Sequence, residues 1–251
     1  MAAAIEIVDV YKKLGSRQVL DGVSLSVETG QILAVVGPSG VGKSTLIKHI
    51  VGLMKPDKGD VLVEGRSVVS ARRSELGQIR QSIGLVFQGA ALLNSLTVAE
   101  NVGLPLVEHT SLPKERIREI VEEKLGLVHL EGFEDYMPAD LSGGMKKRVG
   151  LARALVRDPR IILYDEPTAG LDPIMSNAIV DLAGEVRQKT GATSIIITHD
   201  IHTVFRVADR AAMIFRGKFI AQGTVEEMRN TRDPAVRQFL EGNTHGPLTD
   251  D

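Results

Sequence analysis

Short β-branched apolar runs alternate with longer segments of helical period along most of the chain. Two of these runs, Ile161–Tyr164 and Ser194–Thr198, show no polar alternation, which is typical of strands buried on both faces of a sheet. The segment that follows Pro113 instead places its apolar residues on one helical face. This rhythm predicts an α/β core with a mainly parallel sheet.

The N-terminal part of the chain has a different pattern, in which short strands follow one another closely and are separated by Gly or Asp turns. Such spacing favours an antiparallel sheet beside the core. The strands assigned to this antiparallel β subdomain are Ile5–Val10, Val23–Val27, Ile32–Val36 and Val61–Val63.

Helical patterning takes over between Ala91 and Asp140 and predicts a helical subdomain, at about residues 89–157, inserted in the core. Near the end of the chain, Asp233 and Pro234 form a good helix start. We therefore expect a single domain over residues 1–241, followed by a polar tail at residues 242–251.

Composition excludes several classes of protein. The 251 residues include 30 basic and 32 acidic side chains, so the net charge of -2 gives no general attraction to nucleic acid. The absence of cysteine excludes disulfides, thiolate zinc sites and a cysteine nucleophile. No apolar stretch approaches the roughly 18 to 20 residues of a bilayer span, and the N-terminus has no secretory pattern.

The strongest chemical signal is a glycine-rich loop that matches G-x-x-x-x-G-K-[ST]. It follows the strand Ile32–Val36 and precedes a helix predicted over Lys43–Leu53. Backbone N–H groups, the helix dipole and the lysine can bind phosphate oxygens, and the serine hydroxyl can bind Mg²⁺. The predicted nucleoside triphosphate site consists of Gly37, Pro38, Ser39, Gly40, Val41, Gly42, Lys43, Ser44 and Thr45.

A second Ser/Gly-rich segment, Leu141–Met145, opens a helix that continues to Leu155. A helix start of this composition can bind an anion. A flexible capping turn without a ligand is the alternative interpretation.

The order of motifs resembles that of the ATP-binding cassette (ABC) ATPases from about Ile5 to about Glu227. The resemblance rests on the glycine-rich loop (Walker A), Gln88 (Q-loop), Leu141–Met145 (signature), Ile161–Glu166 (ending in the Walker B residues Asp165 and Glu166), Ala169–Asp172 (with Leu171 and Asp172 as the D-loop) and His199 (switch histidine). It implies a P-loop NTPase core that binds ATP with Mg²⁺ and hydrolyses the ATP.

The same resemblance assigns roles at the strand ends. Ser44, Gln88 and Asp165 would hold the Mg²⁺, while Glu166 would polarise the attacking water. Lys43 would supply positive charge to the phosphates, and His199 would contact the γ-phosphate. A solvated strand end is the alternative for Asp165 and Glu166, and a structural histidine is the alternative for His199.

Members of this family form head-to-tail dimers, so the resemblance implies a homodimer in which Ser142, Gly143 and Gly144 complete the partner's ATP site.

The sequence departs from the family pattern at two positions. Met145 replaces the usual glutamine of the signature. No aromatic residue stands near Leu14, where the family stacks one on adenine, although Tyr11 lies close by in sequence.

The stretch between Gln88 and Leu141 is too short for a long coiled coil, and only one Walker A loop is present. Both features favour a separate ATPase subunit that drives integral-membrane permease subunits. The groove for the permease is predicted in Gly89–Leu112, with apolar residues Leu92, Leu93, Leu96, Val98, Val102, Leu104 and Leu106.

Within the family, Leu104–Pro113, Met145 and Asp233–Gly242 are similar to the ATPase subunit of MCE-type phospholipid transporters such as the Mla system. That similarity implies permease subunits and an MCE-domain protein as partners, with a STAS-domain protein in some systems. It also implies a peripheral position on the cytoplasmic side of the inner membrane. An ATPase for import of amino acids or other solutes, and a regulatory or nucleic-acid-associated ABC ATPase without a permease, are the alternatives.

Overall fold

The computed structural model describes residues 3–249, and the chain divides into two compact units. The first unit combines the N-terminal part, up to Arg80, with the part from Thr193 onward. The second unit comprises Gln81–Ala192.

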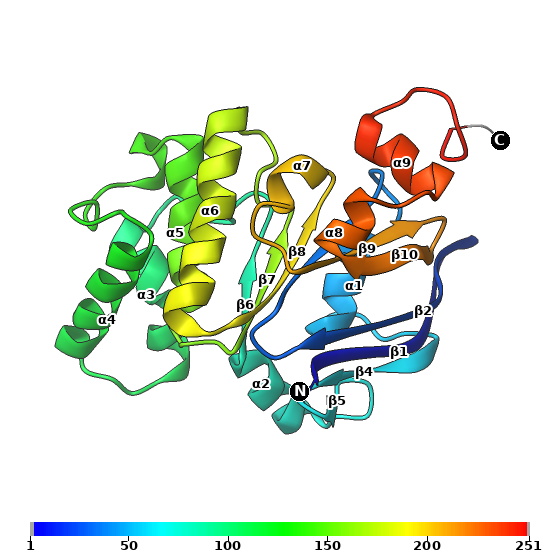
Figure 1. Ribbon diagram of the computed structural model, residues 1–251. Coiled ribbons are helices and arrows are strands. Elements are labelled where there is room, and N and C mark those ends of the chain that lie inside the picture. Colours follow the sequence, from blue (N-terminus) through cyan, green and yellow to red (C-terminus); the bar gives the residue numbers. More distant parts are fainter. Residues whose placement is uncertain (1–2, 250–251) are drawn as a thin grey trace. The chain divides into compact units, whose positions relative to one another are not determined.

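An antiparallel sheet forms one part of the first unit, in the strand order β2-β1-β4-β5. Its long blue strands lie side by side in Figure 1. Ile5, Ile7 and Val10 of β1 are buried, and a register shift between Ile7 and Val10 lets both side chains be covered although they are three positions apart. The strands are β1 (Ala3–Leu14), β2 (Arg17–Glu28), β4 (Lys58–Val63) and β5 (Arg66–Ser67).

The strand Ile32–Val36 (β3) does not belong to this antiparallel sheet, so that prediction was wrong. It pairs in parallel with β8 (Thr193–Thr198) on one side and with β9 (Arg210–Phe215) on the other. All five of its residues are buried. Short connections alone suggested antiparallel pairing, but an unbroken apolar run requires cover on both faces, which parallel interior strands receive. The hairpin strand β10 (Lys218–Thr224) pairs antiparallel with β9.

Helices of the first unit are short. They are α1 (Lys43–Ile50), α2 (Arg73–Gln81, which ends at the boundary of the unit), α7 (Ile201–Val204), α8 (Val225–Arg229) and α9 (Pro234–Glu241). Helix α1 ends before the predicted Leu53 because Gly52 is left-handed, at φ +66°. The Arg80 guanidinium donates to the carbonyls of Val51 and Gly52, just after the end of α1, at 2.8 and 2.9 Å.

Helix α9 starts as predicted, with Asp233 accepting from the N–H groups of Ala235 and Val236.

The second unit contains a parallel strand pair and the longer helices. Strands β6 (Ile83–Val86) and β7 (Ile161–Asp165) pair in parallel, and the prediction of a buried strand at 161–164 is confirmed. Figure 1 shows α3, α4 and α5 gathered together in green, with the yellow α6 alongside α5. The helices are α3 (Val98–His109), α4 (Lys114–Leu127), the 3₁₀ turn η1 (Pro138–Asp140), α5 (Gly143–Leu155) and α6 (Pro173–Thr190).

No helix between residues 3 and 249 has the length and apolar character that crossing a membrane requires.

Candidate functional site

The glycine-rich loop follows β3 directly and is shaped by glycine geometry. Gly37 has a φ of +149°, and a Cβ there would lie 2.3 Å from the carbonyl oxygen of Ile214. Gly42, with φ +109°, caps the start of α1. A side chain at Gly37 would clash with the backbone, so the loop can pass this close to β9 only with glycine. Because α1 begins directly after Gly42, the positive end of its dipole points at the loop.

Lys43 is folded over this loop. Its side chain is only 5% exposed, and its ammonium donates to the carbonyls of Gly37 and Pro38 at 2.8 and 3.1 Å. Arg17, at the turn between β1 and β2, donates to the carbonyl of Gly40 at 3.1 Å. The loop thus holds a buried positive charge at the N-terminus of a helix, which is the arrangement that binds phosphate.

His199 directly follows strand β8, at the edge of the sheet where this loop begins. The register of β3 and β8 places Val36 opposite Thr198, so Gly37 and His199 emerge next to each other at the same edge. The His199 side chain is exposed, whereas the Asp200 carboxylate accepts from the N–H of Thr203 at 3.1 Å and caps α7. An imidazole at this edge can reach a ligand bound in the loop.

In the second unit, the register of β6 and β7 pairs Val86 with Tyr164. Gln88 and Asp165 therefore emerge from neighbouring strands at one edge. Asp165 and Glu166 are half-buried, and Glu166 adopts a left-handed φ of +48°. A non-glycine residue in that region is strained by about 1 to 3 kcal/mol, and such strain concentrates at functional sites.

A buried lysine connects this edge to α5. Lys147 is 7% exposed, and its ammonium donates to the backbone carbonyl of Gln88. Burial lowers the pKa of Lys147, and the Glu166 carboxylate opposes that shift by favouring the charged form. No sequence pattern singles out Lys147, because its burial depends on how α5 packs against the turn after β6.

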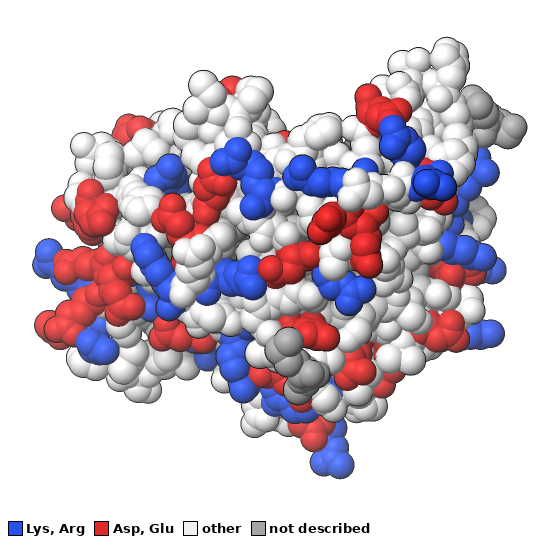
Figure 2. Space-filling view, viewed as in Figure 1, with Lys and Arg blue, Asp and Glu red and all other residues white. Residues whose placement is uncertain are grey.

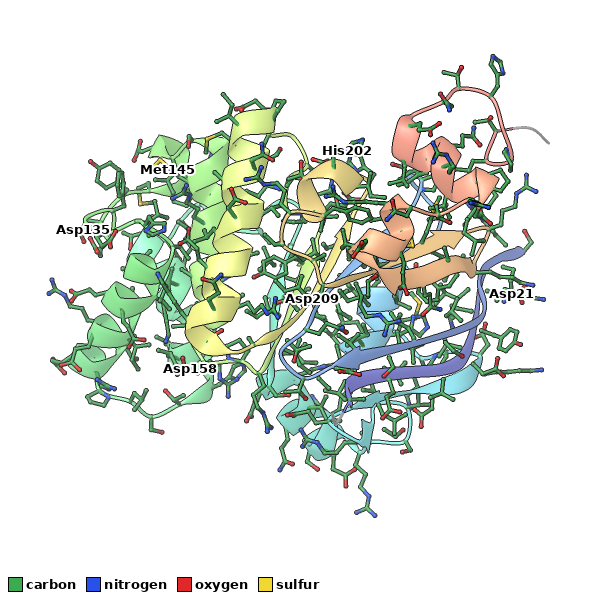
Figure 3. All side chains as sticks on the ribbon, in the orientation of Figure 1. Asp21, Asp135, Met145, Asp158, His202 and Asp209 are labelled. Carbon is green, nitrogen blue, oxygen red and sulfur yellow. The ribbon has the colours of Figure 1, made fainter. Side chains whose placement is uncertain are left out.

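The signature segment forms the exposed N-terminus of α5. The Ser142 side chain accepts from the N–H of Met145 at 3.3 Å, and Ser142 and Gly143 are exposed. Gly144 is buried against Met175, whose Cε would lie 2.4 Å from a Cβ at this position. Met145, labelled in Figure 3, lies in the first turn of the helix. This capped helix start can accept an anion from outside the unit.

The absence of an aromatic side chain at the tip of the β1–β2 turn is clear in the structure. Leu14 is 44% exposed there. Tyr11 instead lies on the sheet, where its hydroxyl would be 2.8 Å from a Cβ at Gly22 and its ring centroid is 6.0 Å from the Lys58 ammonium. The Asp9 carboxylate raises the pKa of Tyr11.

Charge at the surface is mixed in sign. Figure 2 shows Lys and Arg interspersed with Asp and Glu over the face in view.

Among residues 3–249, no cluster of three or more His, Asp or Glu side chains could hold a metal ion. The donors predicted for Mg²⁺, in Ser44, Gln88 and Asp165, are nevertheless the hard oxygen atoms that this ion prefers, and Mg²⁺ commonly takes its remaining ligands from substrate phosphates and water.

A glycine-rich loop between a buried parallel strand and a helix, with a lysine folded over it, defines a P-loop nucleotide-binding protein. Residues 20–169 match the family model described as ABC transporter. The chain belongs to the ABC transporter family, and it is an ATPase.

Individual relatives agree with this assignment. The chain is 41% identical to the intermembrane phospholipid transport system ATP-binding protein MlaF of Haemophilus influenzae, over 97% of this chain and 92% of that protein. It is 40% identical to a probable ribonucleotide transport ATP-binding protein, mkl, of Mycobacterium leprae, over 99% of this chain and 72% of that protein. A dimeric ATP-binding cassette solved in a post-hydrolysis state with ADP and phosphate matches with a TM-score of 0.80 at 34% identity, covering 88% of this chain and 98% of that one.

Proposed function

We propose that this chain is the ATP-hydrolysing subunit of a membrane transporter that moves phospholipid, and that it works as a homodimer. The observation that carries the proposal is the 41% identity to a phospholipid transport ATPase over nearly the full length of both chains. The ATP site itself does not recognise the transported molecule, so the substrate assignment depends on this similarity and on the permease.

The triphosphate of ATP binds in the loop from Gly37 to Thr45. Backbone N–H groups of the loop and the α1 dipole contact the phosphates, and the Lys43 ammonium moves from the Gly37 and Pro38 carbonyls to the phosphate oxygens. Bound Mg²⁺ would be held by Ser44, Gln88 and Asp165, and it would neutralise charge on the phosphates.

Hydrolysis needs an ordered water and a group to accept its proton. The Glu166 carboxylate, fixed by its left-handed backbone, orients the water for in-line attack on the γ-phosphate and accepts its proton. The imidazole of His199, exposed beside the loop, contacts the γ-phosphate and stabilises the charge that develops there.

Completion of the site requires a second copy of the chain. The exposed N-terminus of α5, with Ser142, Gly143 and Gly144, binds the γ-phosphate held by the partner's loop. Closure around two ATP molecules then depends on the γ-phosphates, and their release after hydrolysis lets the two copies separate. This cycle converts the chemistry into a rigid-body motion of the attached permease.

A groove between α3 and α4 is the docking site that we assign to a permease helix. It has a volume of about 450 Å³ and is lined mainly by apolar side chains, together with the charged side chains of Glu100, Lys114 and Arg118. Of the residues expected to form this groove, Leu96 and Leu104 are among its lining residues, whereas Leu92 and Leu93 are not. Val98, Val102 and Leu106 are buried in the unit. Val107, 61% exposed, adds to the groove.

Co-purification tests the assembly. From detergent-solubilised membranes, the tagged chain is expected to retain permease subunits, an MCE-domain protein, a STAS-domain protein and phospholipid. We expect Val107→Arg to lose the permease while ATP binding is kept. Leu53→Arg, at a position 64% exposed in the other unit, is the matched control and retains the permease.

Three results would contradict the proposal. Recovery of a periplasmic solute receptor without an MCE-domain protein would favour a solute importer. ATPase stimulation by DNA or RNA, with no membrane retention, would favour a nucleic-acid-associated ATPase. Equal permease loss from Val107→Arg and Leu53→Arg would remove the groove assignment.

A further inference from the structure

The turn that carries Gln88 has an unusual backbone. Ala90 and Ala91 are consecutive, and both adopt left-handed conformations, with φ of +58° and +49°. Alanine is disfavoured there because its Cβ approaches the neighbouring carbonyl oxygen. Two such residues in succession persist only when surrounding contacts fix them.

Helix α5 supplies those contacts along a single face. The Arg153 guanidinium donates to the carbonyls of Ala90 and Ala91 at 2.6 and 2.8 Å. Lys147, six residues earlier, donates to the carbonyl of Gln88. Between them, Gly150 lets the turn approach closely, since a Cβ there would lie 3.3 Å from the Cβ of Ala90. Positions 147, 150 and 153 share one helix face.

The following part of the loop is anchored separately. Asn101 of α3 is completely buried, and its amide group donates to the carbonyls of Leu93, Leu96 and Thr97 at 2.9 to 3.0 Å. Its side-chain oxygen accepts from the N–H of Leu93 at 2.8 Å. The two anchors limit the movement of the intervening backbone.

We propose that Arg153 and Lys147 are positioning residues that fix the side chain of Gln88 by holding the carbonyls of its strained turn against α5. Each bond orients a planar peptide unit, and orienting the units at 88, 90 and 91 sets the direction in which Gln88 leaves the turn. Burial lowers the pKa of Arg153, but the guanidinium keeps its charge. The inference rests on the role of Gln88 as a Mg²⁺ ligand in the proposed function.

The test compares Arg153→Ala with wild type in two measurements. Amide hydrogen exchange at residues 89–91 of the nucleotide-free protein is expected to become faster, because the turn is released. The Mg²⁺ concentration for half-maximal ATPase activity is expected to rise about tenfold, the typical effect of losing a group that orients a metal ligand. Binding of metal-free ATP is expected to stay unchanged.

Two variants control for general destabilisation. Arg148→Ala, on the same helix, removes a bond to the carbonyl of Val128 at 3.3 Å and is expected to leave both measurements unchanged. Arg153→Lys, which can donate to only one carbonyl, is expected to give an intermediate Mg²⁺ requirement. If Arg153→Ala does not fold, the Gly150→Ala variant replaces it in the test. The added Cβ pushes Ala90 away from α5, so the Mg²⁺ requirement and the rate of amide exchange at residues 89–91 should both rise.

A double-mutant cycle identifies the route of the effect. In a Gln88→Ala background, Arg153→Ala is expected to raise the Mg²⁺ requirement by less than about twofold. Two results would overturn the positioning role while leaving Gln88 as a Mg²⁺ ligand. One is a full additional rise in the Mg²⁺ requirement when Arg153→Ala is added to Gln88→Ala. The other is a folded Arg153→Ala protein whose amide exchange and Mg²⁺ requirement are those of the wild type. A Gln88→Ala protein with the wild-type Mg²⁺ requirement would instead overturn the assignment of Gln88, and the positioning role with it.

Discussion

Replacing Gly37 by alanine should destabilise the first unit much more than the same replacement at Gly40, although both residues belong to one loop. Gly40 has φ +76°, and an added Cβ there would meet nothing within 4 Å. The only cost of Gly40→Ala is therefore the backbone strain of a left-handed alanine, about 1 kcal/mol of stability. At Gly37 the added Cβ would lie 2.3 Å from the backbone oxygen of Ile214, and neither strand can yield easily. Overpacking of this kind adds about 1 to 3 kcal/mol.

Thermal unfolding of the nucleotide-free protein measures the difference. A gap of about 2 kcal/mol corresponds to a Tm about 4 to 8 °C lower for Gly37→Ala than for Gly40→Ala. Gly42→Ala, where the Cβ would meet Val19 at 2.9 Å, should fall between the two. Equal Tm values for Gly37→Ala and Gly40→Ala would refute the claim that contact with β9 requires glycine at position 37.

Glu166→Gln should lower ATP turnover at least about 100-fold, because an amide cannot accept the proton from water, while ATP binding is retained. Near-normal turnover would exclude Glu166 as the base. His49 is fully buried and burial lowers its pKa, so the folded protein takes up a proton there less readily than the unfolded chain. Stability should therefore fall by up to about 1 kcal/mol as the pH drops from about 7.5 to about 5.5, and His49→Leu should make that fall smaller in urea titrations; an unchanged pH dependence would contradict this. Asn101→Ala, which removes the partners of the Leu93 N–H and the Leu96 carbonyl, should cost about 2 to 4 kcal/mol in the same assay, and a cost below about 1 kcal/mol would contradict its anchoring role.

Local patterns predicted the elements around the site well. The strands at 161–164 and 194–198 and the helix starting at Pro234 depend on neighbouring residues, and the structure has all three. The sheet to which Ile32–Val36 belongs could not be inferred from short connections, because its partners β8 and β9 lie more than a hundred residues away in sequence.

The contacts that shape the Gln88 turn were not predictable for a similar reason. Lys147 and Arg153 have the pattern of ordinary charged positions on an amphipathic helix, and only packing shows that they meet carbonyls about sixty residues earlier. Likewise, the apolar spacing of 98–106 could not separate buried Val98 and Val102 from groove-lining Leu104.

In the proposed homodimer, the ATP site formed by the loop of one copy is completed by the α5 N-terminus of the other. Equal amounts of a Lys43→Ala chain and a Ser142→Arg chain, each inactive alone, should regain up to about a quarter of wild-type ATP turnover when mixed, since half of the dimers are then mixed and each has one intact site. Mixed dimers that form, as shown by differential tagging, yet hydrolyse no ATP would contradict the account.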